Sequence, residues 1–162
     1  MKKELLSLAG EHRVASELCK RGVFATITPG NRKQTDIYVI DDDTRQYIRI
    51  EVKTTQARSF LTGLNKRKIK GNGPDFWVLV LFKDGIERFF VLSNLEIEKL
   101  QKKVNDRYFE AYRKRHDGKE IDPLTGVDNL PISTIENARY ENRWDKIELW
   151  LAGNSTKKSH KS

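Results

Sequence analysis

Three charged residues have the types and the spacing that could hold a divalent cation. Asp36 opens one apolar run, and a second apolar run contains Glu51 and Lys53, two positions apart. Side chains alternate between the faces of a β-strand, so Glu51 and Lys53 would lie on one face. If the two runs pair with Asp36 beside Glu51, two carboxylates meet next to an ammonium. Carboxylate oxygens are ligands that Mg²⁺ prefers, so this pattern predicts a metal site.

A β-hairpin over residues 36–53 would bring these groups together. Residues 41–44, with the sequence DDDT, are turn formers between the two apolar runs. The preceding segment, residues 4–21, predicts an amphipathic helix that ends at Gly22, with an apolar face made by Leu8, Val14, Ala15 and Leu18. Glu11 falls at the centre of that face, where an acid is costly unless it has a partner. We therefore expect Glu11 to be a third acid of the site; the alternative is a rim residue paired with a lysine.

The remaining elements complete an α/β pattern. Residues 23–28 predict a strand, and the run FWVLVLF at 76–82 predicts a strand buried on both faces. A turn at Asp84-Gly85 leads to a return strand at 88–92, and a capping box at Ser93 opens a helix to about Arg115. Residues 118–132 should be irregular, and a helix start is expected at 133–136. The apolar stripe that should dock on the domain consists of Trp144, Ile147, Trp150 and Leu151.

Length and charge narrow the classes of function. The chain has 162 residues, enough for one core, and we expect a single domain over 1–153 with a basic disordered tail over 154–162. Its 31 basic and 23 acidic residues give a net charge of +8, so a polyanion is the partner to test first. Without an apolar run of membrane length or a signal-like N-terminus, we expect a cytoplasmic protein and no membrane partner. The lone Cys19 excludes an internal disulfide and should be a small buried side chain.

Basic residues on either side of the acidic pattern are candidates for contacts with a nucleic-acid backbone. Two of them precede Asp36, and residues 54–74 hold five basic residues and no acidic one, interleaved with Phe60. The plainer interpretation is a solvated loop. The candidate nucleic-acid-binding residues are Arg32, Lys33, Gln56, Arg58, Lys66, Arg67, Lys68 and Lys70.

The order and spacing of the sequence motifs resemble those of the PD-(D/E)XK nuclease superfamily, which has the restriction-endonuclease-like fold. The motifs are Gly10-Glu11 with Val14-Ala15 and Glu17-Leu18, then Asn31, Lys33 and Asp36, then Val52-Lys53-Thr54. They look like those of a group of small bacterial proteins in that superfamily, similar in layout to archaeal Holliday junction resolvases. The chain departs from the common pattern at Thr35, where proline is usual, and at Gln34, where glycine is frequent.

The resemblance implies roles for individual residues. Asp36 and Glu51 would be ligands of Mg²⁺, for which Mn²⁺ would substitute, with the Val52 carbonyl as a third ligand and Glu11 as the acid of the first helix. Lys53 would orient or activate water and steady the charge on the phosphate. We therefore expect a metal-dependent endonuclease acting on DNA, with a central mixed β-sheet flanked by helices. The alternatives are a non-catalytic DNA-binding protein with this fold, a structure-specific resolvase and an RNA-directed nuclease. A homodimer would place two sites on two strands, and the sequence leaves the oligomeric state open.

Overall fold

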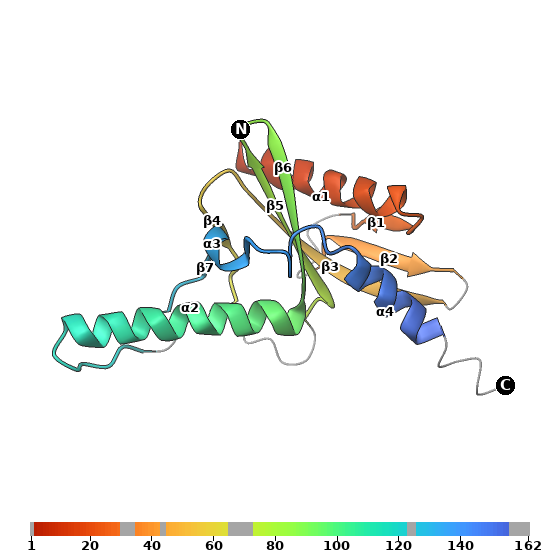
Figure 1. Cartoon of the computed structure of the whole chain (residues 1–162). Helices are drawn as coiled ribbons and strands as arrows, with labels where there is room; N and C mark the ends of the chain where they lie inside the picture. The colour runs from red at the N-terminus through yellow and green to blue at the C-terminus, as the bar shows by residue number, and fades with distance from the viewer. Residues whose placement is uncertain (1, 30–34, 43–44, 65–72, 123–125, 156–162) are drawn as a thin grey trace.

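A five-stranded mixed sheet with helices on both faces forms the body of the protein in a computed structural model (Figure 1). The structure describes residues 2–29, 35–42, 45–64, 73–122 and 126–155. The sheet order is β1 (Ala25–Ile27), β2 (Ile37–Asp41), β3 (Gln46–Thr55), β5 (Phe76–Lys83) and β6 (Ile86–Ser93). Only β3 and β5 run parallel, and the other neighbours are antiparallel. The expected α/β fold with a mixed central sheet is confirmed.

Both expected hairpins are present. In the first, β2 pairs with β3 in a register that places Ile37 opposite Ile50. In the second, β5 and β6 are joined by Asp84 and Gly85, whose φ angles of 54° and 74° are those of a two-residue turn that matches strand twist. Every residue of β5 from Phe76 to Leu81 is buried, as its continuous apolar run predicts.

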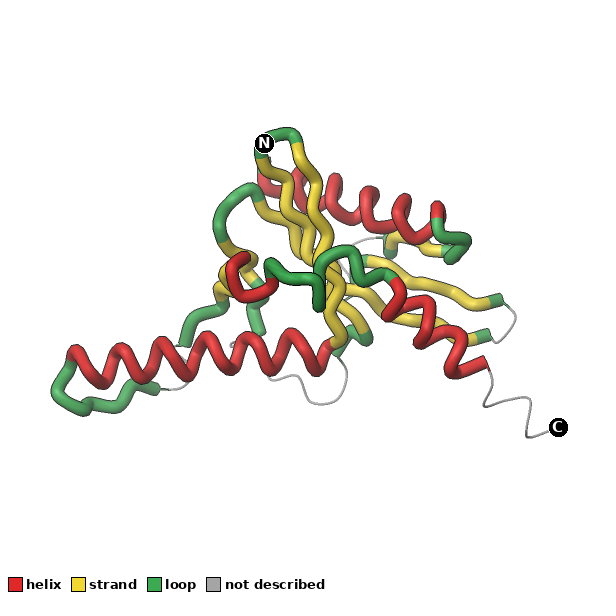
Figure 2. The backbone as a smooth tube through the Cα atoms, viewed as in Figure 1, coloured by secondary structure: helices red, strands yellow, loops and turns green. Residues whose placement is uncertain are grey.

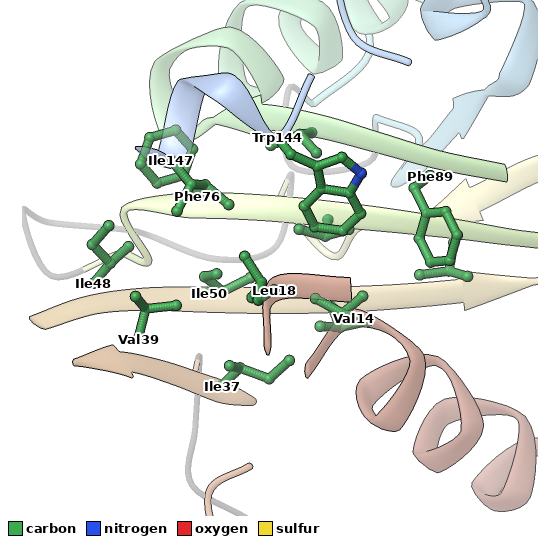
Figure 3. Close-up of a cluster of buried hydrophobic side chains, with 14 residues drawn as sticks. Val14, Leu18, Ile37, Val39, Ile48, Ile50, Phe76, Phe89, Trp144 and Ile147 are labelled. Carbon is green, nitrogen blue, oxygen red and sulfur yellow. The ribbon is translucent and has the colours of Figure 1, made fainter. Parts of the chain in front are cut away.

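One face of the sheet packs against two helices from opposite ends of the chain (Figure 3). Helix α1 (Lys3–Lys20) contributes Val14 and Leu18, α4 (Asp145–Ser155) contributes Ile147, and Trp144 immediately precedes α4. Trp150 and Leu151 pack against the same cluster, so the expected stripe docks as predicted. Helix α1 ends where Gly22, at φ 76°, lets its amide and that of Val23 bond back to the last turn.

On the other face of the sheet, α2 (Asn94–Arg115) covers mainly β5 and β6. This helix begins at the predicted capping box, in which the Ser93 hydroxyl accepts from the Glu96 amide and the Glu96 carboxylate accepts from the Ser93 amide. It packs over this half of the sheet through Ile97 and then runs past the sheet edge (Figure 2). The short strands β4 (Ser59–Leu61) and β7 (Asn129–Pro131) pair antiparallel beside it.

Four expectations are corrected. Residues 118–132 contain β7, and the helix expected from 133 is only the single turn α3 (Ile132–Ile135), so α4 starts ten residues later than that turn ends. Cys19 is exposed, because the buried stripe of α1 is Gly10, Val14 and Leu18 and the next residue lies about 100° round the helix. Leu8 is 45% exposed for the same reason.

No helix within the described residues combines the length and the apolar composition needed to cross a bilayer.

Candidate active site

The acidic pair forms where β2 and β3 stop pairing. Beyond the Ile37–Ile50 pair, the next positions along the two strands are Asp36 and Glu51, so the register meets the condition under which the two carboxylates lie opposite each other. The Asp36 amide still donates to the Ile50 carbonyl at 2.9 Å. Its carboxylate Oδ2 accepts from the Val52 amide at 2.7 Å, in the place of a backbone carbonyl. This bond fixes the Asp36 side chain against β3 and beside Glu51.

Glu51 and Lys53 form a close ion pair on the same face of β3. Lys53 Nζ lies 2.6 Å from Glu51 Oε1. The Glu51 side chain is only 3% exposed, whereas that of Lys53 is 26% exposed. A buried carboxylate is costly unless a positive charge stands close to it, and this position supplies the Lys53 ammonium. The amine is therefore the more exposed member of the pair.

An apolar wall stands behind this pair. Trp77 of β5 is paired in register with Glu51 and is fully buried. Its indole Nε1 donates to Asn94 Oδ1 at 2.9 Å, and the Lys53 ammonium lies 6.0 Å from the ring centroid. The aromatic ring strengthens the electrostatic interactions of its neighbours by excluding water on that side. Trp77 is thus part of the core and also the wall of the site.

Glu11 approaches the same place from α1. The pKa of Glu11 is raised, first by burial of its carboxyl and then by the negative charge of Asp36, and the positive charge of Lys53 acts in the opposite sense. Those interactions are felt only at short range, so Glu11, Asp36 and Lys53 are electrostatic neighbours. Ser7 Oγ donates to Glu11 Oε1 at 3.5 Å, one turn earlier on the helix.

Gly10 explains how α1 comes so near to β3. A methyl group at that position would lie 1.9 Å from Oγ1 of Thr54, the residue after Lys53. Only a residue without a side chain allows this approach, which brings the next residue, Glu11, to the site. The sequence pattern placed Gly10 in the motif, but hydrophobic periodicity does not register a residue that contributes no side chain.

The carboxylates of the site could supply some, but not all, of the oxygen ligands of a divalent cation. Among the described residues, no group of three or more Asp, Glu, His or Cys side chains is arranged to hold a metal ion. Mg²⁺ usually binds through one or two carboxylates, keeps several waters and takes further oxygens from its substrate. The pair Asp36 and Glu51 fits that mode, and Glu11, whose pKa is raised by burial and then by the charge of Asp36, lies within electrostatic reach of that pair.

The candidate nucleic-acid contacts fall into two groups. Gln56 and Arg58 are exposed in the bend that follows β3. Phe60, the aromatic residue interleaved with the cations in the sequence, lies in β4, is fully buried in the core and has no face open to a base. The remaining candidates lie outside the described residues: Arg32, Lys33, Lys66, Arg67, Lys68 and Lys70.

Similarity to known proteins is remote. No protein-family model matches the chain, and the comparison with curated proteins gave no match. Among solved structures, the chain is similar to a bacterial homing endonuclease at 17% identity and a TM-score of 0.45, over 60% of this chain and 74% of that one. At this level of similarity, function has to be argued from the residues of the site.

Proposed function

We propose that this protein is a metal-dependent nuclease that hydrolyses phosphodiester bonds in DNA, with a site of the PD-(D/E)XK type. The observation that supports the proposal most is the end of the β2–β3 ladder, where Asp36 is fixed by the Val52 amide and lies opposite Glu51. A binding module gains nothing from carboxylates at the point where it meets phosphates. The net charge of +8 gives a reason for a polyanionic substrate.

The roles divide between binding the cation and meeting the phosphate. Asp36 and Glu51 would hold Mg²⁺ or Mn²⁺, with the Val52 carbonyl and Glu11 as further oxygen donors. The cation supplies an acidified water and a positive charge beside the scissile phosphate. With a cation held by Asp36 and Glu51, the Lys53 ammonium would be available to face the negative charge that develops on the phosphate.

The test is a cleavage assay on a panel of substrates with Mg²⁺ or Mn²⁺. Supercoiled plasmid, linear duplex, a four-way junction, single-stranded DNA and RNA are incubated with wild type, Asp36→Asn and Lys53→Met. We expect the wild type to cleave DNA and each variant to lose about 100-fold or more of that rate, the range for removal of one electrostatic group from an active site. Lys83→Met, at the far end of β5, is the matched control and should keep full activity.

Other outcomes identify the alternatives. Cleavage confined to the junction would indicate a structure-specific resolvase, and cleavage confined to RNA would indicate an RNA-directed nuclease. Tight DNA binding without cleavage in either metal would identify a non-catalytic binding protein and overturn the proposal.

A further inference from the structure

The sheet face that holds the candidate site continues into an uncovered aromatic surface. Period-two alternation places Tyr38 and Ile40 of β2 on the same face as Asp36, opposite the core residues Ile37 and Val39. On β3, Tyr47 and Arg49 share a face with Glu51 for the same reason. The helix α2 packs over the β5–β6 half of the sheet, and Tyr47 remains 59% exposed.

A depression of about 620 Å³ lies on this surface. Its lining includes Thr26, Tyr38, Ile40 and Tyr47. The rings of Tyr38 and Tyr47 meet edge to face, with centroids 5.7 Å apart. This volume lies within the range of small-molecule sites and exceeds what one aromatic ring needs.

The depression begins next to the proposed site of chemistry. Tyr38 follows Asp36 by two positions on an extended strand, a separation of about 7 Å. A phosphate held at Asp36, Glu51 and Lys53 would therefore have its neighbouring nucleotide over Tyr38. The register places Arg49 directly opposite Tyr38, between the acidic pair and Tyr47.

The charged residues that line the depression favour one part of a nucleotide over another. Asp41 and Asp42 line the depression with one cation, Arg45. Two carboxylates repel a phosphate, but they accept hydrogen bonds from the amino groups on base edges. An uncharged, flat group with an amino edge is therefore the favoured occupant over the sugar-phosphate backbone.

We infer that this depression binds an unpaired nucleobase adjacent to the scissile phosphate, stacked on Tyr38 and Tyr47. A base inside a continuous duplex is stacked on its neighbours and cannot enter. The substrate class is then DNA with an unpaired nucleotide at the cleavage point, such as a single strand, a flap or a bulge. The position of the base next to a cleaved phosphate rests on the proposed nuclease function. Binding of a base to this surface can be tested without cleavage.

The experiment measures affinity in EDTA, so that no hydrolysis occurs. Fluorescence anisotropy gives the Kd of a labelled single-stranded oligonucleotide and of an abasic chain with the same length and the same number of phosphates. Stacking of one base on an aromatic side chain is worth roughly tenfold in affinity. The wild type should prefer the base-bearing strand about 10-fold, and Tyr47→Ala should reduce that ratio to about one. Tyr47→Trp should keep it.

Tyr108→Ala is the matched control, because Tyr108 is a partly exposed tyrosine on α2, 36% exposed, on a different element. It should leave the ratio unchanged, and thermal unfolding confirms that each variant is folded. A ratio that is equal in wild type and Tyr47→Ala, or a wild type with no preference for bases, overturns the inference. Failure of the cleavage assay with a normal base preference would overturn the nuclease proposal and leave the base site standing.

Discussion

At the residue scale, the central feature of the candidate site is the ion pair between Lys53 and Glu51. A carboxylate that is 3% exposed would be strongly disfavoured without the ammonium 2.6 Å away. The pair also keeps the amine ordered at the place where a phosphate would bind. If the proposed function is right, this ion pair would open when a cation and a phosphate bind.

The ionised carboxylate of Glu11 should lower the free energy of unfolding. The pKa of its carboxyl is raised from the ordinary 4.5 by burial and by Asp36, so the folded state favours the protonated form. Stability is therefore lost as pH rises from about the ordinary pKa through the raised one. Glu11→Gln should raise the free energy of unfolding at pH 7 by a few tenths of a kcal/mol, since the group is partly screened by solvent.

Urea unfolding at pH 7 and pH 4 measures this effect. The difference between Glu11→Gln and wild type should shrink at the lower pH, where the wild-type carboxyl is protonated. Added Mg²⁺ should stabilise the wild type more than the variant, because a ligand that binds only the folded state stabilises it. A variant that is less stable than wild type at pH 7 would contradict the electrostatic account of Glu11.

At the scale of elements, the position of α1 depends on its contact with β3. Gly10→Ala would bring a methyl group 1.9 Å from Thr54 Oγ1 and 3.0 Å from Thr54 Cβ, so the helix or the strand must shift. We expect a loss of about 1–3 kcal/mol in the free energy of unfolding, typical of overpacking, and reduced cleavage because Glu11 moves with the helix.

A glycine in α4 provides the matched control for this change. Beyond its chain neighbours and its own helix backbone, no atom of the described residues lies within 4 Å of the methyl group that Gly153→Ala would add, so that variant should be neutral or slightly stabilising. Thr54→Ala should restore part of the stability lost in Gly10→Ala, because it removes the nearest atom. Denaturant unfolding of the four proteins measures both effects, and equal behaviour of the two glycine variants would show that the α1–β3 contact is not tight.

The local sequence pattern was sufficient to predict the elements whose apolar residues follow a clear helical or strand period. The hairpin of β2 and β3, the buried β5 and the capped start of α2 all follow from signals within a few residues of each other. It was insufficient for β4 and β7, which pair across 70 residues and have three residues each, with Pro131 in β7. Strands so short have no detectable period, and only tertiary packing selects their partner.

The sequence placed Asp36 and Glu51 on neighbouring strands of a hairpin but left the register open, and the structure supplies the register that pairs them. Tyr38 and Tyr47 could have been placed on that face by the same alternation, and their neighbours Asp36 and Glu51 were the available signal. The raised pKa of Glu11 and the wall formed by Trp77 depend on packing between distant segments, which one sequence does not reveal.

At the scale of the whole molecule, the positive charge is expected to guide a polyanion to the site. The cations at 66–68 lie outside the described residues, but they follow the strand that holds Glu51 and Lys53. Replacing Lys66, Arg67 and Lys68 with alanine should weaken DNA binding and reduce the slope of log K against log salt by up to about 2.7, since each phosphate contact contributes about 0.9.

A second triple variant separates local contacts from net charge. Arg113, Lys114 and Arg115 stand at the end of α2 that extends away from the sheet, and their replacement with alanine changes the net charge by the same amount (Figure 1). Filter binding at several salt concentrations should show a smaller change of slope for this control. An unchanged slope in the 66–68 variant would assign those cations to solvation alone.

The most direct measurement is the position of Mn²⁺ in crystals of the protein soaked with that ion, located by its anomalous scattering. The account predicts one peak about 2.0–2.2 Å from carboxylate oxygens of both Asp36 and Glu51, with Lys53 shifted from its contact with Glu51. A peak elsewhere, or no peak while Lys53 remains on Glu51, would contradict it.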